Sequence, residues 1–296
     1  MQDFDFCGNC QRFISSAKQK QTMVNCEDAP EEYQLKGSAA INSKYLSKYE
    51  IVCDMGEGFG KYRIAPDLEI MPLIDVANIA CGFHAGDYNI MREMVRLAKK
   101  HGVKVGSHPG LPDRMGFGRR KWDIPPEEVY NMVLYQTGAL KAFLDAEGMP
   151  LSHIKAHGEL YFYVTRDINI MRAYLEAAKV FNVPVIGAKN YIFEQTAKEM
   201  GVDLIQELYV DIDWNRKGCL VSVQKSRDKN PDIIHNDVKQ AGIYDKITTF
   251  DNEEINLGFG KDPFLLCLHS DMPTALDNIK KARKAINELN TAKGIM

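Results

Sequence analysis

From residue 50 onward, the chain alternates short runs typical of β-strands, several of them nearly all apolar, with longer segments whose apolar residues recur at helical spacing. Strands that helices cover on both faces have this apolar character, whereas a half-exposed antiparallel sheet alternates apolar and polar residues. Repeated strand and helix units predict a parallel sheet, and about seven of them favour an α/β fold of the closed or nearly closed barrel type. The expected strands are 51–55, 76–81, 103–106, 153–156, 184–187, 204–208 and 264–269.

The helical segments between these runs have an apolar face and recognisable starts. Segments 89–100, 129–144 and 275–286 carry apolar residues that fall on one side of a helix. The run Pro125-Pro126-Glu127-Glu128 suits the first turn of a helix, where proline and acids are favoured. A doubly wound open sheet is the alternative architecture. The glycines of 56–60 lack the G-x-G-x-x-G spacing of a dinucleotide fold, so we reject that fold.

Residues 1–48 differ from the rest of the chain in composition and pattern, because they are rich in polar residues and show no sustained apolar period. We interpret them as an N-terminal extension that is poorly structured or contains one short helix near 11–20, and residues 49–296 as the barrel domain. Cys7 and Cys10 form a C-x-x-C motif, with Cys26 further on. A zinc or redox site is one interpretation, but the usual partner motifs are lacking and free thiols are the simpler one.

Composition and charge exclude several classes of protein. A formal net charge of -3 gives no electrostatic reason to expect binding to nucleic acid or to an anionic membrane. No segment approaches the ~20 apolar residues of a membrane helix, and the acidic start is unlike a secretory signal. Seven scattered cysteines are expected to be reduced thiols, which predicts a cytoplasmic protein.

Polar residues gather directly after the predicted strands. In parallel α/β folds these positions meet at one end of the sheet, where the working groups of enzymes lie. A single histidine there is more often structural, but several of them beside two acids predict a catalytic or ligating site. The residues are Asp54 and Glu57 after the first strand, His84 after the second, His108 after the third, Lys155 and His157 at the fourth, and His269 at the last.

Two chemical uses of these residues remain open. Neutral imidazoles and carboxylates can hold a divalent metal that makes a nucleophile of bound water. Alternatively, Asp54 or Glu57 acts as a general base without metal, while Lys155 and His157 donate hydrogen bonds to an oxyanion. Nearby, the pair Arg119-Arg120 follows a glycine-rich loop, where it either binds a substrate carboxylate or closes a lid as a solvated pair.

The loops themselves resemble those of a known family. The strings are C-D-M-G-E-G-F-G, A-N-I-A-C-G-F-H-A-G-D, S-H-P-G-L-P-D-R-M-G-F-G-R-R, Y-Q-T-G-A-L, H-I-K-A-H-G-E-L-Y and C-L-H-S-D-M-P. They occur in order between residues 49 and 289 and are similar to the motifs of the LamB/YcsF family, which includes a 5-oxoprolinase subunit of bacteria and fungal members. Long polar strings of this kind rarely recur by chance.

The resemblance implies a β/α barrel of the glycoside hydrolase/deacetylase type, typically with seven strands. It also implies lactam metabolism: the bacterial member is one subunit of an ATP-dependent 5-oxoprolinase that works with two partner subunits. Fungal lactam-utilisation relatives suggest 2-pyrrolidinone-like substrates. No G-x-x-x-x-G-K-[ST] loop is found in this chain, so a nucleotide site would be built differently or lie on a partner.

The resemblance also supplies site residues, position by position. The expected catalytic residues are Asp54, Glu57, His84, Lys155 and His157. The expected substrate-binding residues are Asn78, Asp87, His108, Asp113, Arg119, Arg120, Glu207, Asp211, His269 and Asp271. The chain departs from the family pattern at Val52, at Tyr88, within 156–162, where alanine and asparagine become Glu159 and Phe162, and at 209–212, where an arginine is lost. These departures touch the pocket and its rim.

The leading hypothesis is therefore a hydrolase that opens a lactam such as 5-oxoproline or 2-pyrrolidinone. In it, Asp54 or Glu57 activates the nucleophile, and His84, His157 and Lys155 stabilise the charged intermediate. An unstrained five-membered lactam is a poor electrophile, which makes coupling to ATP through partner subunits an expectation. The alternatives are a metal-dependent deacetylase or lactone hydrolase, and a protein that binds its ligand without catalysis.

Overall fold

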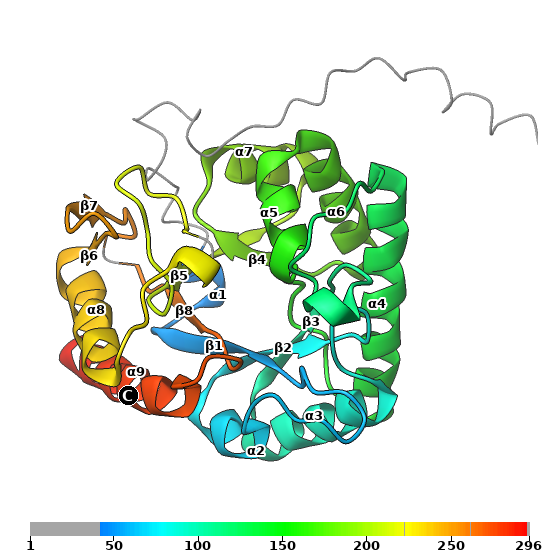
Figure 1. The fold of residues 1–296 in the computed structure, drawn as a ribbon, viewed down its shortest axis with the longest axis horizontal. Coiled ribbons are helices and arrows are strands. Elements are labelled where there is room, and N and C mark those ends of the chain that lie inside the picture. Colours follow the sequence, from blue (N-terminus) through cyan, green and yellow to red (C-terminus); the bar gives the residue numbers. More distant parts are fainter. Residues whose placement is uncertain (1–41, 222, 261, 295–296) are drawn as a thin grey trace, which may run out of the picture.

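The strands form one parallel sheet that curls into a ring (Figure 1). The computed structural model describes residues 42–294 except 222 and 261. In this part of the chain, six strands are paired in the order β3-β2-β1-β8-β5-β4, and every pairing between neighbours is parallel. The strands are β1 (Glu50–Met55), β2 (Val76–Ala80), β3 (Lys104–His108), β4 (Val185–Ala188), β5 (Leu204–Tyr209) and β8 (Leu265–Leu268).

Ile154 closes the gap between the two outer strands of this sheet. It forms one isolated parallel bridge with Ser107 in β3 and another with Val185 in β4. The predicted strand at 153–156 therefore exists as a short seventh member of the ring. Around the barrel the strands follow their order in the sequence, as in β/α barrels. The predicted α/β barrel of about seven parallel strands is confirmed.

Helices cover the outside of the ring (Figure 1). The apolar stripe predicted at 89–100 lies on α3, where Ile90, Met94, Val95 and Ala98 are buried. This helix begins at Asp87, whose carboxylate accepts hydrogen bonds from the first backbone amides, as a good N-cap does. The helices are α1 (Asn42–Tyr45), α2 (Asp67–Ile70), η3 (Met71–Leu73), α3 (Tyr88–His101), η4 (Arg114–Gly116), α4 (Pro126–Ala146), α5 (Gly158–Arg166), α6 (Ile168–Phe181), α7 (Tyr191–Met200), η5 (Val223–Lys225), α8 (Pro231–Tyr244) and α9 (Ala275–Ala292).

Residues 42–48, the described part of the expected N-terminal extension, pack against the barrel. Asn42 is buried, its side-chain amide donates to the backbone oxygens of Gln206 and Pro263, and its side-chain oxygen accepts from the amide of Gln206. Leu46 belongs to the core. The division of the chain at residue 48 stays a prediction. The expected helix near 11–20 and the motif of Cys7, Cys10 and Cys26 lie outside the described residues.

Two further predictions can be compared with the described residues. The cysteines at 53, 81 and 267 are free and buried, as expected of reduced thiols, but Cys219 is disulfide-bonded, so that expectation is wrong there. None of the described helices combines the length and the apolar character needed to cross a bilayer. The antiparallel hairpin of β6 (Lys246–Thr248) and β7 (Glu254–Asn256) was not predicted, because its strands are short and mostly polar.

Candidate active site

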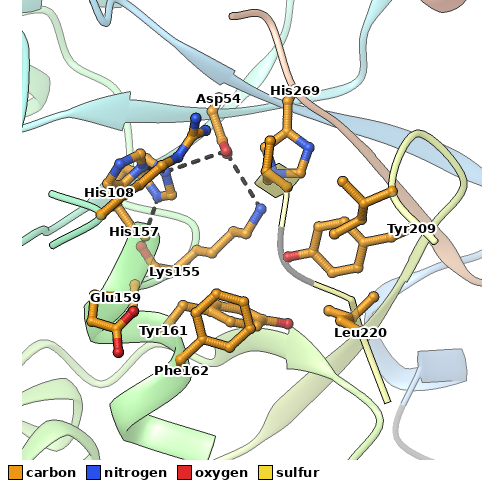
Figure 2. Close-up of a pocket in the computed structure, with 15 residues that line it drawn as sticks. Asp54, His108, Lys155, His157, Glu159, Tyr161, Phe162, Tyr209, Leu220 and His269 are labelled. Carbon is orange, nitrogen blue, oxygen red and sulfur yellow. Dashed lines mark hydrogen bonds and ion pairs between the residues drawn. The ribbon is translucent and has the colours of Figure 1, made fainter. Parts of the chain in front are cut away.

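A cavity of about 90 Å³ opens at the carboxyl ends of the strands (Figure 2). A single water needs roughly 10–15 Å³ of such space, so the cavity suits a molecule of a few heavy atoms. Its charged and imidazole lining comes from strand ends, loops and a helix start that are far apart in the chain and that the barrel brings to one mouth. These lining residues are Asp54, His108, Arg119, Lys155, His157, Glu159 and His269.

Lys155 is the buried cation on one side of the cavity. It directly follows the Ile154 bridge, and its ammonium lies 3.3 Å from Asp54 Oδ1 and 3.2 Å from Glu207 Oε2. It also donates to the sulfur of Cys267 at 2.9 Å. Burial on its own would lower the pKa of Lys155, but these neighbours, with Asp54 foremost, raise it well above 10.5. Lys155 is therefore a fixed positive charge and not a nucleophilic amine.

Asp54, at the end of β1, is fixed by neighbours on both sides. Its pairing register places it beside Asn78 of β2, whose side-chain amide donates to Asp54 Oδ1 at 2.7 Å. Asn78 is held in turn by His153 Nε2, which lies 2.6 Å from Asn78 Oδ1. Burial would raise the pKa of Asp54, but the charges of His108 and Lys155 outweigh it and hold the pKa well below 3.8. Asp54 is thus an ionised carboxylate that faces the cavity.

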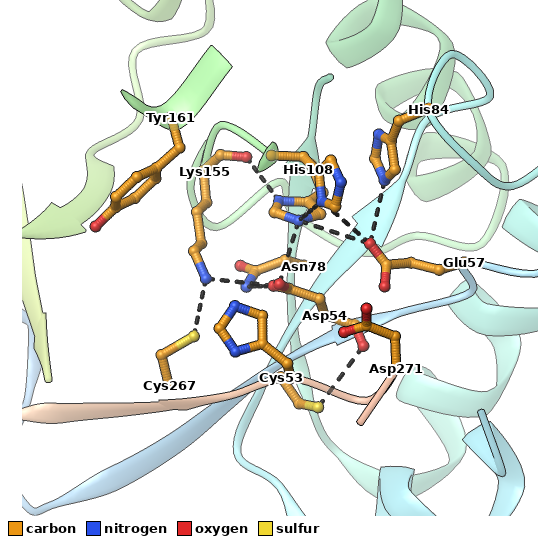
Figure 3. A network of polar contacts seen from close by, with 12 residues as sticks. Cys53, Asp54, Glu57, Asn78, His84, His108, Lys155, Tyr161, Cys267 and Asp271 are labelled. Carbon is orange, nitrogen blue, oxygen red and sulfur yellow. Dashed lines mark hydrogen bonds and ion pairs between the residues drawn. The ribbon is translucent and has the colours of Figure 1, made fainter. Parts of the chain in front are cut away.

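Three histidines and one acid form the imidazole cluster, which we define as Glu57, His84, His108 and His157. Figure 3 shows Glu57, His84 and His108 side by side. Glu57 Oε1 lies 3.2 Å from both His84 Nε2 and His157 Nδ1. His157 Nδ1 is 3.0 Å from His108 Nε2, and the rings of His84 and His157 stack at 3.6 Å with an angle of 5°. One ligand atom from each of the four residues lies within 4.8 Å of the others, so this group could hold a metal ion.

The tight stacking in the imidazole cluster depends on glycines of the loop after β3. A side chain at Gly110 would overlap the ring of His84, and one at Gly118 would press on both His84 and His157. Gly118 also has φ +66°, a left-handed conformation that glycine adopts without strain. The glycine-rich sequence of this loop is therefore required by the closeness of the two rings.

Burial governs the charges of the imidazole cluster. It lowers the pKa of His84 to about 3 and lowers that of His157, since a buried imidazolium loses its hydration. Burial would raise the pKa of Glu57, but hydrogen bonds from His157 and His84 outweigh it and bring the pKa below its ordinary 4.5. The cluster thus combines an ionised carboxylate with at least one neutral imidazole.

The mouth of the cavity also carries cations. We define the cationic wall as Lys155, Arg119 and His269, all of which line the cavity. Arg119 Nη1 lies 2.8 Å from Asp271 Oδ2, and His269 Nδ1 lies 3.0 Å from Asp211 Oδ2. Burial would lower the pKa of His269, but Asp211 outweighs it and raises the pKa to about 9. His269 is therefore protonated near neutral pH.

Glu207 lies in β5 and does not itself line the cavity. Besides its ion pair with Lys155, its Oε1 accepts hydrogen bonds from the hydroxyls of Tyr209 at 2.7 Å and Tyr161 at 3.1 Å. Of the other predicted substrate-binding residues, Asn78, Asp211 and Asp271 hold Asp54, His269 and Arg119, as described above. All four residues lie next to cavity groups, and their roles toward a substrate stay predictions.

Like the four residues just described, the remaining three that were predicted to bind substrate do not line the cavity. Asp87 caps α3 and also accepts from the backbone amide of Gly60 at 2.8 Å. Asp113 and Arg120 form a two-bond ion pair with each other inside the loop. The structure gives these residues contacts that shape the loops at the mouth. Of the two adjacent arginines, only Arg119 is directed to the cavity.

Several residues around the cavity were not among the predicted catalytic or substrate-binding residues. Glu159 and Phe162, at the start of α5, line it, and Glu159 Oε1 is buried without a hydrogen-bond partner among the described residues. Their departure from the family pattern was the available signal. Cys267 lies inside an apolar strand, where nothing local in the sequence indicates a contact with Lys155.

A parallel β/α barrel whose acids, imidazoles and lysine meet in one cavity at the carboxyl ends of its strands has the layout of a barrel enzyme. Residues 49–294 match the LamB/YcsF family, and the chain belongs to that family.

Two curated relatives and one solved structure show how far the similarity extends. The chain is 41% identical over 256 residues to lactam utilization protein lamB of Emericella nidulans, covering 86% of this chain and 99% of that protein. It is 38% identical over 245 residues to a 5-oxoprolinase subunit of Thermus thermophilus, covering 81% and 96%. It matches the crystal structure of a lactam utilization protein from Thermus thermophilus with a TM-score of 0.75 and 37% identity, covering 84% and 98%. The recognised motifs thus belong to a match along nearly the whole length of these relatives.

Proposed function

We propose that this protein hydrolyses the amide bond of a small cyclic amide, with 5-oxoproline and 2-pyrrolidinone as the model substrates. The observation that carries the proposal is the cavity itself, because Asp54 and all three residues of the cationic wall line the same small space. The names of the relatives, one a lactam utilization protein and the other a 5-oxoprolinase subunit, support the same substrate class.

In this proposal, Lys155 donates a hydrogen bond to the carbonyl oxygen of the ring. Its charge lies at the cavity and is held by Asp54 and Glu207, so it needs no rearrangement as negative charge develops on that oxygen. His157 lines the same space and contributes a second polar group. His84 is fully buried behind His157, so its contribution to the intermediate would be indirect.

Asp54 orients the attacking water and accepts its proton. Water oxygen bonds to the carbonyl carbon, the ring C–N bond breaks, and the proton passes to the leaving nitrogen, which gives an open-chain amino acid. Asp54 is preferred to Glu57 for this step because Asp54 lines the cavity, whereas Glu57 lies behind the histidines. Arg119 and His269 face the same cavity and would bind a carboxylate carried by the substrate.

We further propose that turnover is coupled to ATP hydrolysis and involves partner subunits. An unstrained lactam is a poor electrophile, so activation of its carbonyl group would make attack by water feasible. The name of the Thermus relative, which is that of one subunit, supports an assembly of several chains. The coupling is tested by comparing turnover with and without ATP and candidate partners.

The experiment combines binding with product analysis. The full chain is screened by thermal shift against 5-oxoproline, 2-pyrrolidinone, γ-butyrolactone and N-acetylglucosamine, with and without ATP, since a ligand of the folded state raises the Tm. Formation of glutamate or 4-aminobutyrate is then measured by chromatography. Lactams are expected to shift the Tm and to be opened. A response confined to the lactone or the acetylated sugar would overturn the proposal.

A metal-dependent deacetylase or lactone hydrolase is the second candidate. The imidazole cluster favours it, because histidine and carboxylate ligands are the set found in catalytic zinc sites. Both candidates share the cavity and differ in the bond that is broken. The screen above separates them by product.

A further inference from the structure

The hydrogen bonds at the outer edge of the imidazole cluster fix the protonation of two rings. His108 Nδ1 lies 2.9 Å from the backbone oxygen of Lys155, and His157 Nε2 lies 2.8 Å from that of Phe117. A carbonyl oxygen has no proton to give, so both of these ring nitrogens must donate. In neutral rings, the other nitrogens, His108 Nε2 and His157 Nδ1, therefore carry lone pairs.

These two lone pairs point at each other. His108 Nε2 and His157 Nδ1 are 3.0 Å apart, and Glu57 Oε1, also an acceptor, lies 3.2 Å from His157 Nδ1 and 3.9 Å from His108 Nε2. Three acceptors that meet without a donor repel one another. Their separation is understandable only if something electron-poor, a proton or a metal cation, lies among them.

We propose that His108 Nε2, His157 Nδ1 and Glu57 Oε1 bind one divalent transition-metal ion of the zinc class. The spacing agrees with this, because bonds of ~2.0–2.2 Å in a tetrahedral site separate the ligand atoms by about 3.3–3.5 Å. Two imidazoles and one carboxylate select such ions over Mg²⁺ and Ca²⁺, which prefer all-oxygen sites. The backbone carbonyls that accept from the outer nitrogens are the supporting contacts that ligating histidines usually have.

The neighbours of the three ligands define the rest of the site. His84 Nδ1 has no partner among the described residues, so His84 acts best as a donor from Nε2 to Glu57, 3.2 Å away, and not as a ligand. Asp54 Oδ2 lies 3.3 Å from His108 Nε2. The ion would therefore have Asp54 beside it, and a fourth position open toward the cavity that His108 and His157 line.

This inference rests on the proposed function in one respect only, which is that the bound ion would take part in the hydrolysis.

The experiment uses the full chain. The protein is stripped of metal with a chelator, and Co²⁺ and Zn²⁺ are then titrated in, with calorimetry for both ions and visible absorption for Co²⁺. One equivalent is expected to bind, and Co²⁺ is expected to give the intense visible bands of a low-coordinate site. Neither readout depends on lactam turnover, so failure of the lactam assay would leave the result intact.

Matched variants locate the ion. Glu57→Gln and His157→Asn are each expected to weaken binding at least about 100-fold, since the first replaces a charged ligand by a neutral amide and the second removes a ligating imidazole. Glu159→Gln changes another buried acid beside the cavity and is expected to bind metal as the parent chain does. Circular dichroism verifies that each variant is folded.

Two results would overturn the proposal. The first is a parent chain that binds no stoichiometric metal and shows no metal-dependent rise in Tm, which would leave a shared proton as the bridge between the two rings. The second is unchanged affinity in folded Glu57→Gln, which would place the ion elsewhere. If a variant does not fold, the titration of the parent chain still decides whether the metal site exists.

Discussion

Two groups of residues at the barrel mouth, the cationic wall and the imidazole cluster, differ in how their charges are paired. On the cationic wall, each cation already has a carboxylate within about 3.3 Å: Lys155 has Asp54, Arg119 has Asp271 and His269 has Asp211. In the imidazole cluster, two ring nitrogens, His108 Nε2 and His157 Nδ1, and a carboxylate oxygen of Glu57 face one another instead. The positive charges of the cationic wall are therefore already paired with carboxylates without a ligand, whereas the imidazole cluster favours binding of an electron-poor group.

This difference suggests a division of labour with Asp54 at the boundary. One of its oxygens contacts Lys155 of the wall, and the other contacts His108 of the cluster. A balanced wall binds an anionic or polar substrate at little cost in reorganisation, because its cations are already oriented. The cluster is the side on which a nucleophile can be activated.

Lys155→Met would remove the charge that balances the wall, and we expect the largest effect here. Asp54 and Glu207 would remain buried without their shared cation, which costs about 3–5 kcal/mol of unfolding free energy. Turnover of the true substrate is expected to fall by a factor on the order of 10²–10³ as the oxyanion partner is lost. Denaturant unfolding and kcat are the measurements.

Lys189→Met is a matched control for this change. Lys189 is also buried, but its ammonium donates to the backbone oxygen of Gly258 at 2.6 Å and forms no ion pair among the described residues. Loss of the Lys189 ammonium should lower the unfolding free energy by about 1–3 kcal/mol, which is clearly less than the loss expected for Lys155→Met. Equal destabilisation by the two variants would mean that the carboxylates do not need Lys155.

Asp54→Asn tests the boundary between the two sides. Asparagine keeps the shape and the contact with Asn78 but cannot accept a proton, so kcat is expected to drop by about 10²–10⁴. The expected change in Tm is small, since Lys155 keeps its ion pair with Glu207. Thermal unfolding and kcat are measured on the same preparation. Retained turnover would remove Asp54 from the mechanism.

How much of this site could be predicted from the sequence is clear from particular residues. Asp54, His84, His108 and His157 follow apolar runs, and strand ends in a parallel barrel meet at one mouth, so their convergence was predictable. The fold was predictable for the same reason, because strands buried on both faces are apolar throughout. The short strand at Ile154 was also predicted, although half of its residues are polar and it forms only single bridges.

Pairings between distant side chains were not predictable in the same way. Arg119 and Arg120 are neighbours in the sequence, yet one pairs with Asp271 and the other with Asp113. Which arginine faces the cavity depends on the backbone of the loop and on packing against Phe117, over whose ring Arg119 lies. A sequence pattern records residue types but not these orientations.

The adjacent arginines allow a smaller test of the wall. Arg119→Ala is expected to raise KM for a carboxylate-bearing lactam by about 10–100-fold, as expected for a lost charge-assisted hydrogen bond. KM for uncharged 2-pyrrolidinone should change much less. Arg120→Ala, which removes a charge outside the cavity, is the control and should leave both KM values near those of the parent. A similar rise from both variants would show a general electrostatic effect of the loop.

The smallest expected effect is a pH dependence of stability from His269. Its pKa is raised to about 9 from an ordinary 6.5, so the protonated ring stabilises the folded state most below pH 6.5. This contribution declines as the pH rises and is lost as the pH passes through about 9. The loss of unfolding free energy should be on the order of 1–3 kcal/mol, and each kcal/mol corresponds to about 2–4 °C in Tm.

Two variants test this pH dependence. In His269→Gln, the Tm should fall less than in the parent as the pH rises from 6.5 to about 9, whereas the exposed control His101→Gln should show the same fall as the parent. Parallel curves for the parent and His269→Gln would show that Asp211 does not hold a charged imidazole, and the wall would then consist of Lys155 and Arg119 alone.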